Sequence, residues 1–173
     1  MEGILSLIDT IIEEHKHIAE DASALEQRAN DLSSLLALDR ATRDFEPASL
    51  DRSKRSLQGL RESLERIDRA LRAHFDREES ALLRAFEEHG GATFAAALRS
   101  LLFEHQELKS RIDKVNLDIA QLISGGLYGG VWEGMAYGLR AYINNTRRLL
   151  EAHAQSEQEL LQRLRKELIA EQS

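Results

Sequence analysis

Apolar side chains recur every three or four residues along most of the chain, and polar residues fill the positions between them. This period matches the 3.6 residues of an α-helical turn, so the pattern predicts amphipathic helices. Four stretches carry it, and they predict helices roughly over residues 3–38, 48–89, 92–124 and 131–168. In the second stretch, the predicted apolar stripe ends with Leu71, His74, Glu78, Ala81 and Ala85.

Turn-forming residues separate the four stretches. Gly90-Gly91 and Gly125-Gly126 follow the second and third stretches, and Pro47, the only proline, lies between the first two. Short connections between long helices favour antiparallel neighbours. We therefore expect an all-α protein, an up-down-up-down antiparallel four-helix bundle that forms a single domain over residues 1–173.

Composition and charge limit the classes of function that the chain can have. Hydrophobic residues make up 42% of the chain, charged residues 31% and aromatic residues 5%, which is typical of a helical protein. A net charge of −7 removes the electrostatic driving force for binding nucleic acid or an anionic membrane. No apolar run approaches the ~18 residues that span a bilayer, and no basic segment precedes the apolar N-terminus as in a signal peptide. We expect a soluble, cytoplasmic protein without nucleic-acid or membrane partners.

The chain contains no cysteine. This excludes disulfides, thiolate nucleophiles, cysteine-ligated zinc and iron–sulfur clusters. Any metal site must therefore be built from histidine and carboxylate side chains.

Four histidines interrupt the apolar stripes, one in each predicted helix: His15, His74, His105 and His153. In an antiparallel pair of helices, two residues face each other when the midpoint of their numbers falls in the connection. For each pair of consecutive histidines the midpoint falls in the predicted connection, so all four are expected in one layer of the core. A single histidine on such a stripe is more often a hydrogen-bonded core residue, but four in one layer favour a metal site.

Two carboxylates lie on the same stripes. Glu78 follows His74 by four residues and Glu157 follows His153 by four, so each lies one helical turn from its histidine on the same face. Two ionised carboxylates in an apolar core are costly unless a cation compensates them. We predict two metal ions, one held by His15 and His74 and the other by His105 and His153, with Glu78 and Glu157 bridging them.

Other polar residues are given structural roles. His17 points away from the stripe and is predicted at the surface, and His89 is predicted to cap a helix end. Glu79 and Glu104 neighbour ligand candidates and are candidates for hydrogen bonds to the imidazoles. The glycine-rich residues 125–134, with the only tryptophan, are predicted to form a connection whose apolar side chains cover one end of the bundle.

Four motifs resemble the hemerythrin-like family of cation-binding bundles: Glu14-His15, His74-Phe75-x-x-Glu78-Glu79, Glu104-His105-x-x-Leu108 and His153-x-x-x-Glu157. The resemblance implies a non-haem di-iron centre of two iron ions, with an oxo or hydroxo bridge, that binds or reacts with dioxygen, nitric oxide or peroxide. The oxygen carriers of the family have two histidines four residues apart on the third helix. Here Leu101 and Lys109 stand at that spacing from His105, so we do not expect stable oxygen carriage.

Alternatives from other classes remain at this point. A di-iron redox enzyme uses the same open metal positions as a binding protein, so the sequence does not separate the two. A ferritin-like enzyme needs two inward Glu-x-x-His pairs, and only Glu14 and His17 show that spacing. A metal-free helical interaction or signalling module, including a histidine phosphotransfer bundle that uses His17 or His89, is the alternative without metal.

Overall fold

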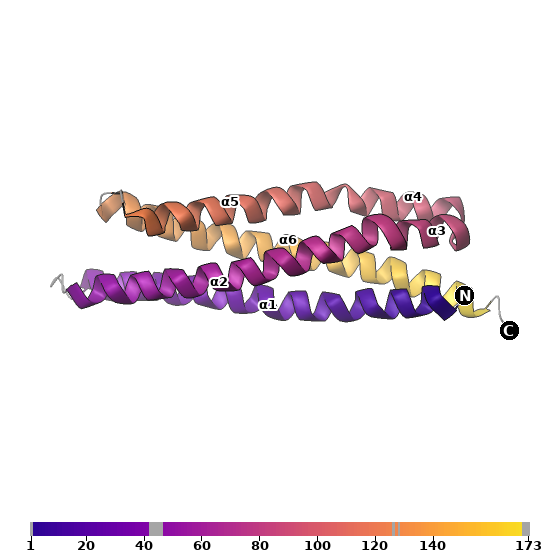
Figure 1. The fold of residues 1–173 in the computed structure, drawn as a ribbon, viewed down its shortest axis with the longest axis horizontal. Coiled ribbons are helices and arrows are strands. Elements are labelled where there is room, and N and C mark those ends of the chain that lie inside the picture. The colour runs from indigo at the N-terminus through magenta and orange to yellow at the C-terminus, as the bar shows by residue number, and fades with distance from the viewer. Residues whose placement is uncertain (1, 42–46, 126, 128, 171–173) are drawn as a thin grey trace.

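The structure, a computed structural model, describes residues 2–41, 47–125, 127 and 129–170. Nearly all of these residues are helical and none of them lies in a strand, which confirms the all-α prediction. The helices lie along one long axis, and the two chain ends lie at the same end of the rod (Figure 1). None of the described helices is long and apolar enough to cross a membrane.

The described residues form four helical stretches. The first is α1 (Glu2–Ala41), and the second joins α2 (Pro47–Arg77), a π-helical turn η1 (Glu78–Leu82) and α3 (Leu83–His89). The third joins α4 (Gly91–Leu102) and α5 (Glu104–Ser124), and the fourth is α6 (Gly129–Ala170). Both α1 and α5 pack against α2 and α6, an arrangement compatible with a four-helix bundle.

Glycines end two of the stretches where the sequence predicts it. The backbone of Gly91, just after α3, has a φ of 68°, and Gly125, just after α5, has a φ of 78°. Glycine adopts this left-handed conformation without the steric cost that a side chain adds, which makes it the usual residue after a helix. Gly126, the second glycine of the predicted break after α5, lies outside the described residues.

The π-helical turn η1 shifts the buried face of the second stretch. Ala81 is exposed and Ala85 is only half-buried, so the prediction that they continue the apolar stripe is wrong. Leu82 and Phe86 are buried in their place. A π-turn holds about one residue more than an α-turn, and the extra residue moves every later side chain to the next position around the helix.

The predicted third helix is interrupted at Phe103. This residue separates α4 from α5, although its φ of −63° and ψ of −28° remain in the right-handed helical region. The two helices therefore follow one another closely along the rod, as Figure 1 shows. The sequence gives no glycine or proline that would signal this break.

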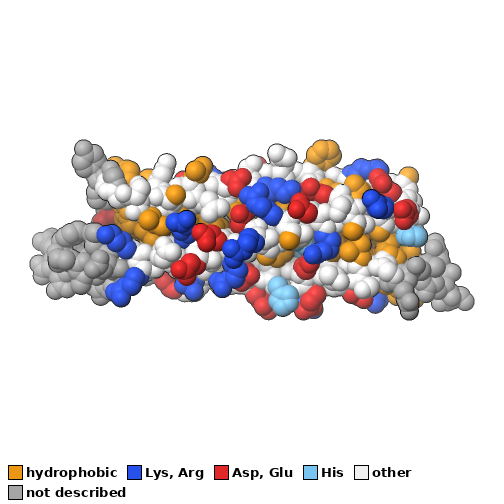
Figure 2. All heavy atoms as spheres, viewed as in Figure 1, with side chains coloured by type: hydrophobic (Ala, Val, Ile, Leu, Met, Phe, Trp, Pro, Cys, Tyr) orange, Lys and Arg blue, Asp and Glu red, His pale blue; other side chains and the backbone are white. Residues whose placement is uncertain are grey.

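The buried apolar residues form two clusters. The larger one lies between the histidine layer and the end of the rod where α1 ends and α6 begins (Figure 1). It extends from Ile18 to Leu36 on α1 and from Ala136 to Leu150 on α6. The smaller cluster lies towards the chain ends and includes Ile8, Leu82, Leu98 and Leu161. Between them lie the buried histidines and glutamates. On the face seen in Figure 2, acidic and basic side chains are interspersed, with hydrophobic side chains visible between them.

Part of the glycine-rich segment packs against the core, whereas Val131 is exposed. The helix α6 already begins at Gly129, so only part of the segment is a connection. Leu127 and Trp132 pack against the larger cluster, and the Trp132 indole Nε1 donates a hydrogen bond of 2.9 Å to the carbonyl oxygen of Leu122. This bond ties the start of α6 to the end of α5.

Candidate metal centre

The structure brings the four predicted histidines into one buried layer, with one each from α1, α2, α5 and α6. The ring centroids of His15 and His74 are 4.8 Å apart, and those of His105 and His153 are 4.9 Å apart. The Nε2 atoms of His105 and His153 lie only 3.1 Å from each other. The imidazoles therefore form two pairs whose members come from different helices.

Three of the four rings are held at their outer nitrogen by a carboxylate. The Nδ1 atoms lie 3.0 Å from Glu14 Oε2 for His74, 2.9 Å from Glu79 Oε1 for His105, and 2.9 Å from Glu104 Oε2 for His153. A carboxylate at Nδ1 fixes a proton on that nitrogen and leaves the lone pair of Nε2 directed inward. The inward Nε2 atoms are thus prepared as ligands.

Two of these outer carboxylates are themselves paired with cations. The Arg77 guanidinium contacts Glu14 Oε1, and the Lys109 ammonium donates to Glu79 Oε1 at 2.9 Å. The pKa of Glu79 lies below its ordinary value, because burial is outweighed by Lys109 and His105. Glu79 therefore stays ionised and keeps accepting the Nδ1 proton of His105.

His15 differs from the other three histidines. Its side chain is 6% exposed, yet neither of its ring nitrogens has a hydrogen-bond partner. Its Nε2 faces two carboxylates, at 3.6 Å from Glu78 Oε1 and 3.4 Å from Glu157 Oε2. Nothing among the described residues holds its outer nitrogen, so this ring is the least fixed of the four.

Glu78 connects the two histidine pairs. Its Oε1 atom lies 2.7 Å from His74 Nε2, and its Oε2 atom lies 3.2 Å from His105 Nε2. The carboxylate is fully buried and belongs to η1, the π-helical turn. One oxygen thus faces the pair on α1 and α2, and the other faces the pair on α5 and α6.

Glu157 lies opposite Glu78 and is also fully buried. Its Oε2 atom is 3.4 Å from His15 Nε2 and 3.7 Å from His153 Nε2. Glu157 therefore also faces one histidine of each pair, although at longer distances than Glu78.

The donor set fits cations. His15, His74, Glu78 and Glu157 offer ligand atoms within 4.8 Å of one another, and Glu78, His105 and His153 form a second such group. All four oxygens of the two carboxylates are buried without a hydrogen-bond donor, which is costly unless a cation compensates them. In addition, two Nε2 lone pairs face each other across 3.1 Å. Cations between these atoms remove both penalties.

The pKa values reflect the same competition between burial and charge. Burial lowers the pKa of His15, but Glu157 and Glu78 outweigh it and raise the pKa to about 9. Burial raises the pKa of Glu78, but contacts with His105, His15 and His74 bring it well below its ordinary value. Burial dominates at the two other groups, raising the pKa of Glu157 and lowering that of His153. Without metal, a proton on His15 therefore offsets part of the carboxylate charge.

Other predicted residues can also be located. His17 is exposed as predicted, and Glu79 and Glu104 contact the imidazoles. His89 is the exposed last residue of α3, and its predicted capping role stays a prediction. The sequence places Glu14 in the Glu14-His15 motif and in an isolated Glu-x-x-His pair with His17 without assigning it a contact, and in the structure it holds His74. Its position directly before His15, repeated in Glu104-His105, is the signal that identifies it as a partner across the helix interface.

Phe75 is a further residue of the site that sequence reasoning did not assign. Its ring stacks on His105 with centroids 3.9 Å apart and planes 19° apart. The same ring meets the edge of His153 at 6.2 Å. Phe75 therefore fixes the orientation of the pair on α5 and α6.

Comparison with known proteins agrees with the donor set. The family model described as the hemerythrin HHE cation binding domain matches residues 6–165, nearly the whole chain. No curated protein and no solved structure matches the chain.

Proposed function

The chain belongs to the hemerythrin HHE cation-binding domain family, and on this premise we propose that it is a non-haem di-iron protein that binds or senses a small ligand. The proposed ligand is dioxygen, nitric oxide or peroxide, and the proposed role is in an iron or oxidative-stress response. The proposed metal ligands are His15, His74, Glu78, His105, His153 and Glu157. The proposal takes the bundle as antiparallel and up-down-up-down, which the common level of the four histidines supports.

One observation carries the proposal: two groups of buried ligand atoms share Glu78. A shared carboxylate between two pairs of imidazoles is suited to two adjacent divalent ions, because it neutralises charge on both. Carboxylate and imidazole together suit iron better than a soft ion, which favours sulfur ligands.

The number of ligands favours a reactive centre. Each ion would have at most two imidazoles and two shared carboxylates, which is fewer than the six ligands an octahedral ion accepts. When bound, the iron pair supplies open coordination positions and reversible electron transfer. Leu101 is half-buried and Lys109 is paired with Glu79, so neither contributes a further ligand at the positions beside His105.

The proposed function predicts how the protein responds to air. We expect anaerobically purified protein to contain about two ferrous ions per chain, which become ferric within minutes of exposure to air. Removing the oxygen should not restore the ferrous spectrum, because the open positions leave both ions accessible to oxidation. Metal analysis together with the optical spectrum before air, after air and after degassing measures this directly.

Two results of that experiment would contradict the proposal. Protein without bound metal under anaerobic conditions would favour the metal-free interaction module. Repeated recovery of the ferrous spectrum on degassing would favour a reversible carrier instead. Parallel addition of nitric oxide to the anaerobic protein gives a spectral change only if iron is present and accessible.

A second prediction concerns pH. A metal ion binds His15 only when its Nε2 is free, and the pKa of about 9 means that this ring is protonated at neutral pH without metal. The apparent affinity for ferrous iron should therefore rise about tenfold per pH unit between pH 7 and pH 9, from this group alone. Anaerobic titrations at several pH values measure the slope.

The control for this prediction is His17→Asn, which removes an exposed imidazole two residues away on the same helix. This variant should keep the wild-type slope. An affinity that does not change with pH over this range would show that metal does not displace a proton from His15.

A further inference from the structure

A small cavity lies against the histidine layer. Its volume is about 30 Å³, and α1, α2 and α6 line it. Leu71 precedes His74 and lines the cavity, whereas Glu78 follows His74 and does not, so the cavity and the carboxylates lie on opposite sides of the layer. A cavity needs roughly 10–15 Å³ to hold one water molecule, so this one has room for a diatomic molecule and excludes organic substrates.

The outer end of the cavity falls on the interface between α1 and α6. Long polar side chains bridge this interface at several levels. Arg165 Nε lies 3.2 Å from Asp9 Oδ1, Arg147 Nε lies 2.6 Å from Glu26 Oε2, and Arg140 Nε donates to Asn30 Oδ1 at 2.9 Å. These contacts place a polar bridge across the interface at each of three levels.

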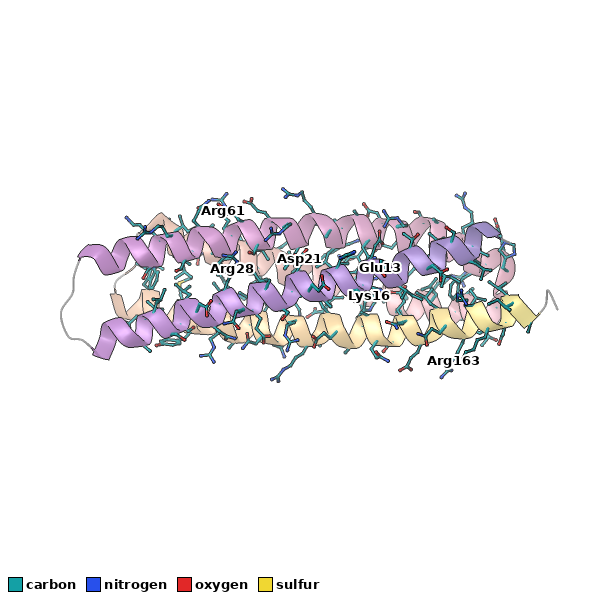
Figure 3. The ribbon with its side chains drawn as sticks, turned by 90° about the horizontal axis from the view of Figure 1, so that it is seen from below. Glu13, Lys16, Asp21, Arg28, Arg61 and Arg163 are labelled. Carbon is teal, nitrogen blue, oxygen red and sulfur yellow. The ribbon has the colours of Figure 1, made fainter. Side chains whose placement is uncertain are left out.

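Alanines replace the bridging side chains beside the cavity. Ala19 lies seven residues before Glu26 on α1, and Ala154 lies seven residues after Arg147 on α6, so the two are at the same level of the interface. Both line the cavity together with Ala22, and Ala19 is exposed. Figure 3 shows α1 and α6 side by side here, near the labelled Lys16 and Asp21, which flank Ala19 on α1.

At its inner end the cavity borders the ring of His15. This is the histidine whose outer nitrogen has no partner, whereas carboxylates hold the other three rings. The lining also includes His74 and His153, so the cavity reaches both imidazoles of one pair and one imidazole of the other. Apart from the imidazoles and Glu151, the lining is aliphatic or aromatic.

We propose that the gap between Ala19 and Ala154 is the size-selective opening through which a neutral diatomic ligand reaches the metal centre past His15. This inference rests on the proposed function, since it concerns the approach to the same centre. The apolar lining favours a neutral diatomic, because a more polar molecule loses hydrogen bonds to water without replacing them. A second, smaller void of about 10 Å³ continues from Ala22 and Leu150 into the larger cluster.

A larger side chain in the opening should slow the binding of the diatomic ligand without removing the metal. We expect Ala19→Leu and Ala154→Leu each to lower the second-order rate constant of nitric oxide binding to the ferrous protein at least about tenfold. Iron content and helix content should stay unchanged, because neither residue is a proposed ligand. Stopped-flow absorbance with nitric oxide under anaerobic conditions gives the rate constants.

The matched control is Ala152→Leu, an exposed alanine on α6 that does not line the cavity. It should bind nitric oxide at the wild-type rate. Wild-type rates in Ala19→Leu and Ala154→Leu with normal iron content would overturn the proposed opening and leave the proposed function intact.

A second measurement does not depend on iron chemistry. Xenon is a neutral apolar probe, and we expect it to shift the methyl resonances of Ala22, Leu71 and Leu150 in the zinc-loaded full chain, saturably and less so in Ala154→Leu. Absence of these shifts would overturn the cavity as a binding site. If the iron-loaded wild type failed to bind nitric oxide at all, the proposed function would fail while the xenon result still decided whether the opening exists.

Discussion

Replacing Glu78 and Glu157 together by glutamine should reduce bound iron from about two ions per chain to less than one. The two carboxylates are the only buried anions that face both histidine pairs among the described residues. Without them, four neutral imidazoles would hold two divalent ions whose mutual repulsion is no longer compensated. Metal analysis after anaerobic loading and desalting measures the stoichiometry.

Each single variant separates the contributions of the two carboxylates. Glu78 reaches both pairs at 3.2 Å or less, whereas the contacts of Glu157 are 3.4 and 3.7 Å. Glu78→Gln should therefore lose more metal than Glu157→Gln. The control is Glu88→Gln with Glu159→Gln, two exposed glutamates that lie outside both ligand groups. Full loading of the double variant at Glu78 and Glu157 would refute the bridging role.

Removing the metal should lower the melting temperature strongly. An ion present at a thousand times its dissociation constant stabilises the folded state by about 4 kcal/mol. In a chain of this size, each kcal/mol shifts the melting temperature by roughly 2–4 °C, so loss of one ion should cost roughly 8–16 °C. Thermal denaturation followed by circular dichroism, with and without a chelator, measures the difference, and added ferrous iron should reverse it.

Removing both carboxylates is not expected to lower the melting temperature of the metal-free protein. In the metal-free state, Glu78 and Glu157 are buried with oxygens that no hydrogen bond satisfies, and the cation on His15 offsets only part of their charge. Metal-free protein with both glutamines should therefore melt no lower than metal-free wild type and should gain little from added iron. A wild-type melting temperature that is insensitive to chelator would show that metal does not stabilise the fold.

The histidine layer could be predicted because helix geometry is regular. A residue at an apolar position of a helix faces the core whatever its chemical type, so His15, His74, His105 and His153 were placed by the spacing of their aliphatic neighbours. The position of each break fixed which residues of neighbouring helices lie at the same level.

Features that depend on contacts between helices could not be predicted from the spacing of apolar residues along the chain. Glu14 contacts a histidine sixty residues away, and its position directly before His15 indicates a partner without showing which histidine that partner is. The π-helical turn is also not visible in the sequence. Ala81 and Ala85 continue the apolar stripe with regular spacing, whereas the structure buries Leu82 and Phe86 in their place. Only packing against neighbouring helices, such as η1 against α1 and Phe86 against Phe94 of α4, decides between the two phases.

The division of the core into two apolar clusters has a kinetic consequence. Proteins open locally in cooperative units, and units with fewer buried contacts open more often. The smaller cluster, near the chain ends, includes Leu82 and Leu161, which follow Glu78 and Glu157 by four residues. The imidazoles border the larger cluster. We therefore expect fraying of this end to displace the carboxylates before the histidines. A bound metal ion would then exchange with solvent through transient opening of this end, while the rest of the bundle stays folded.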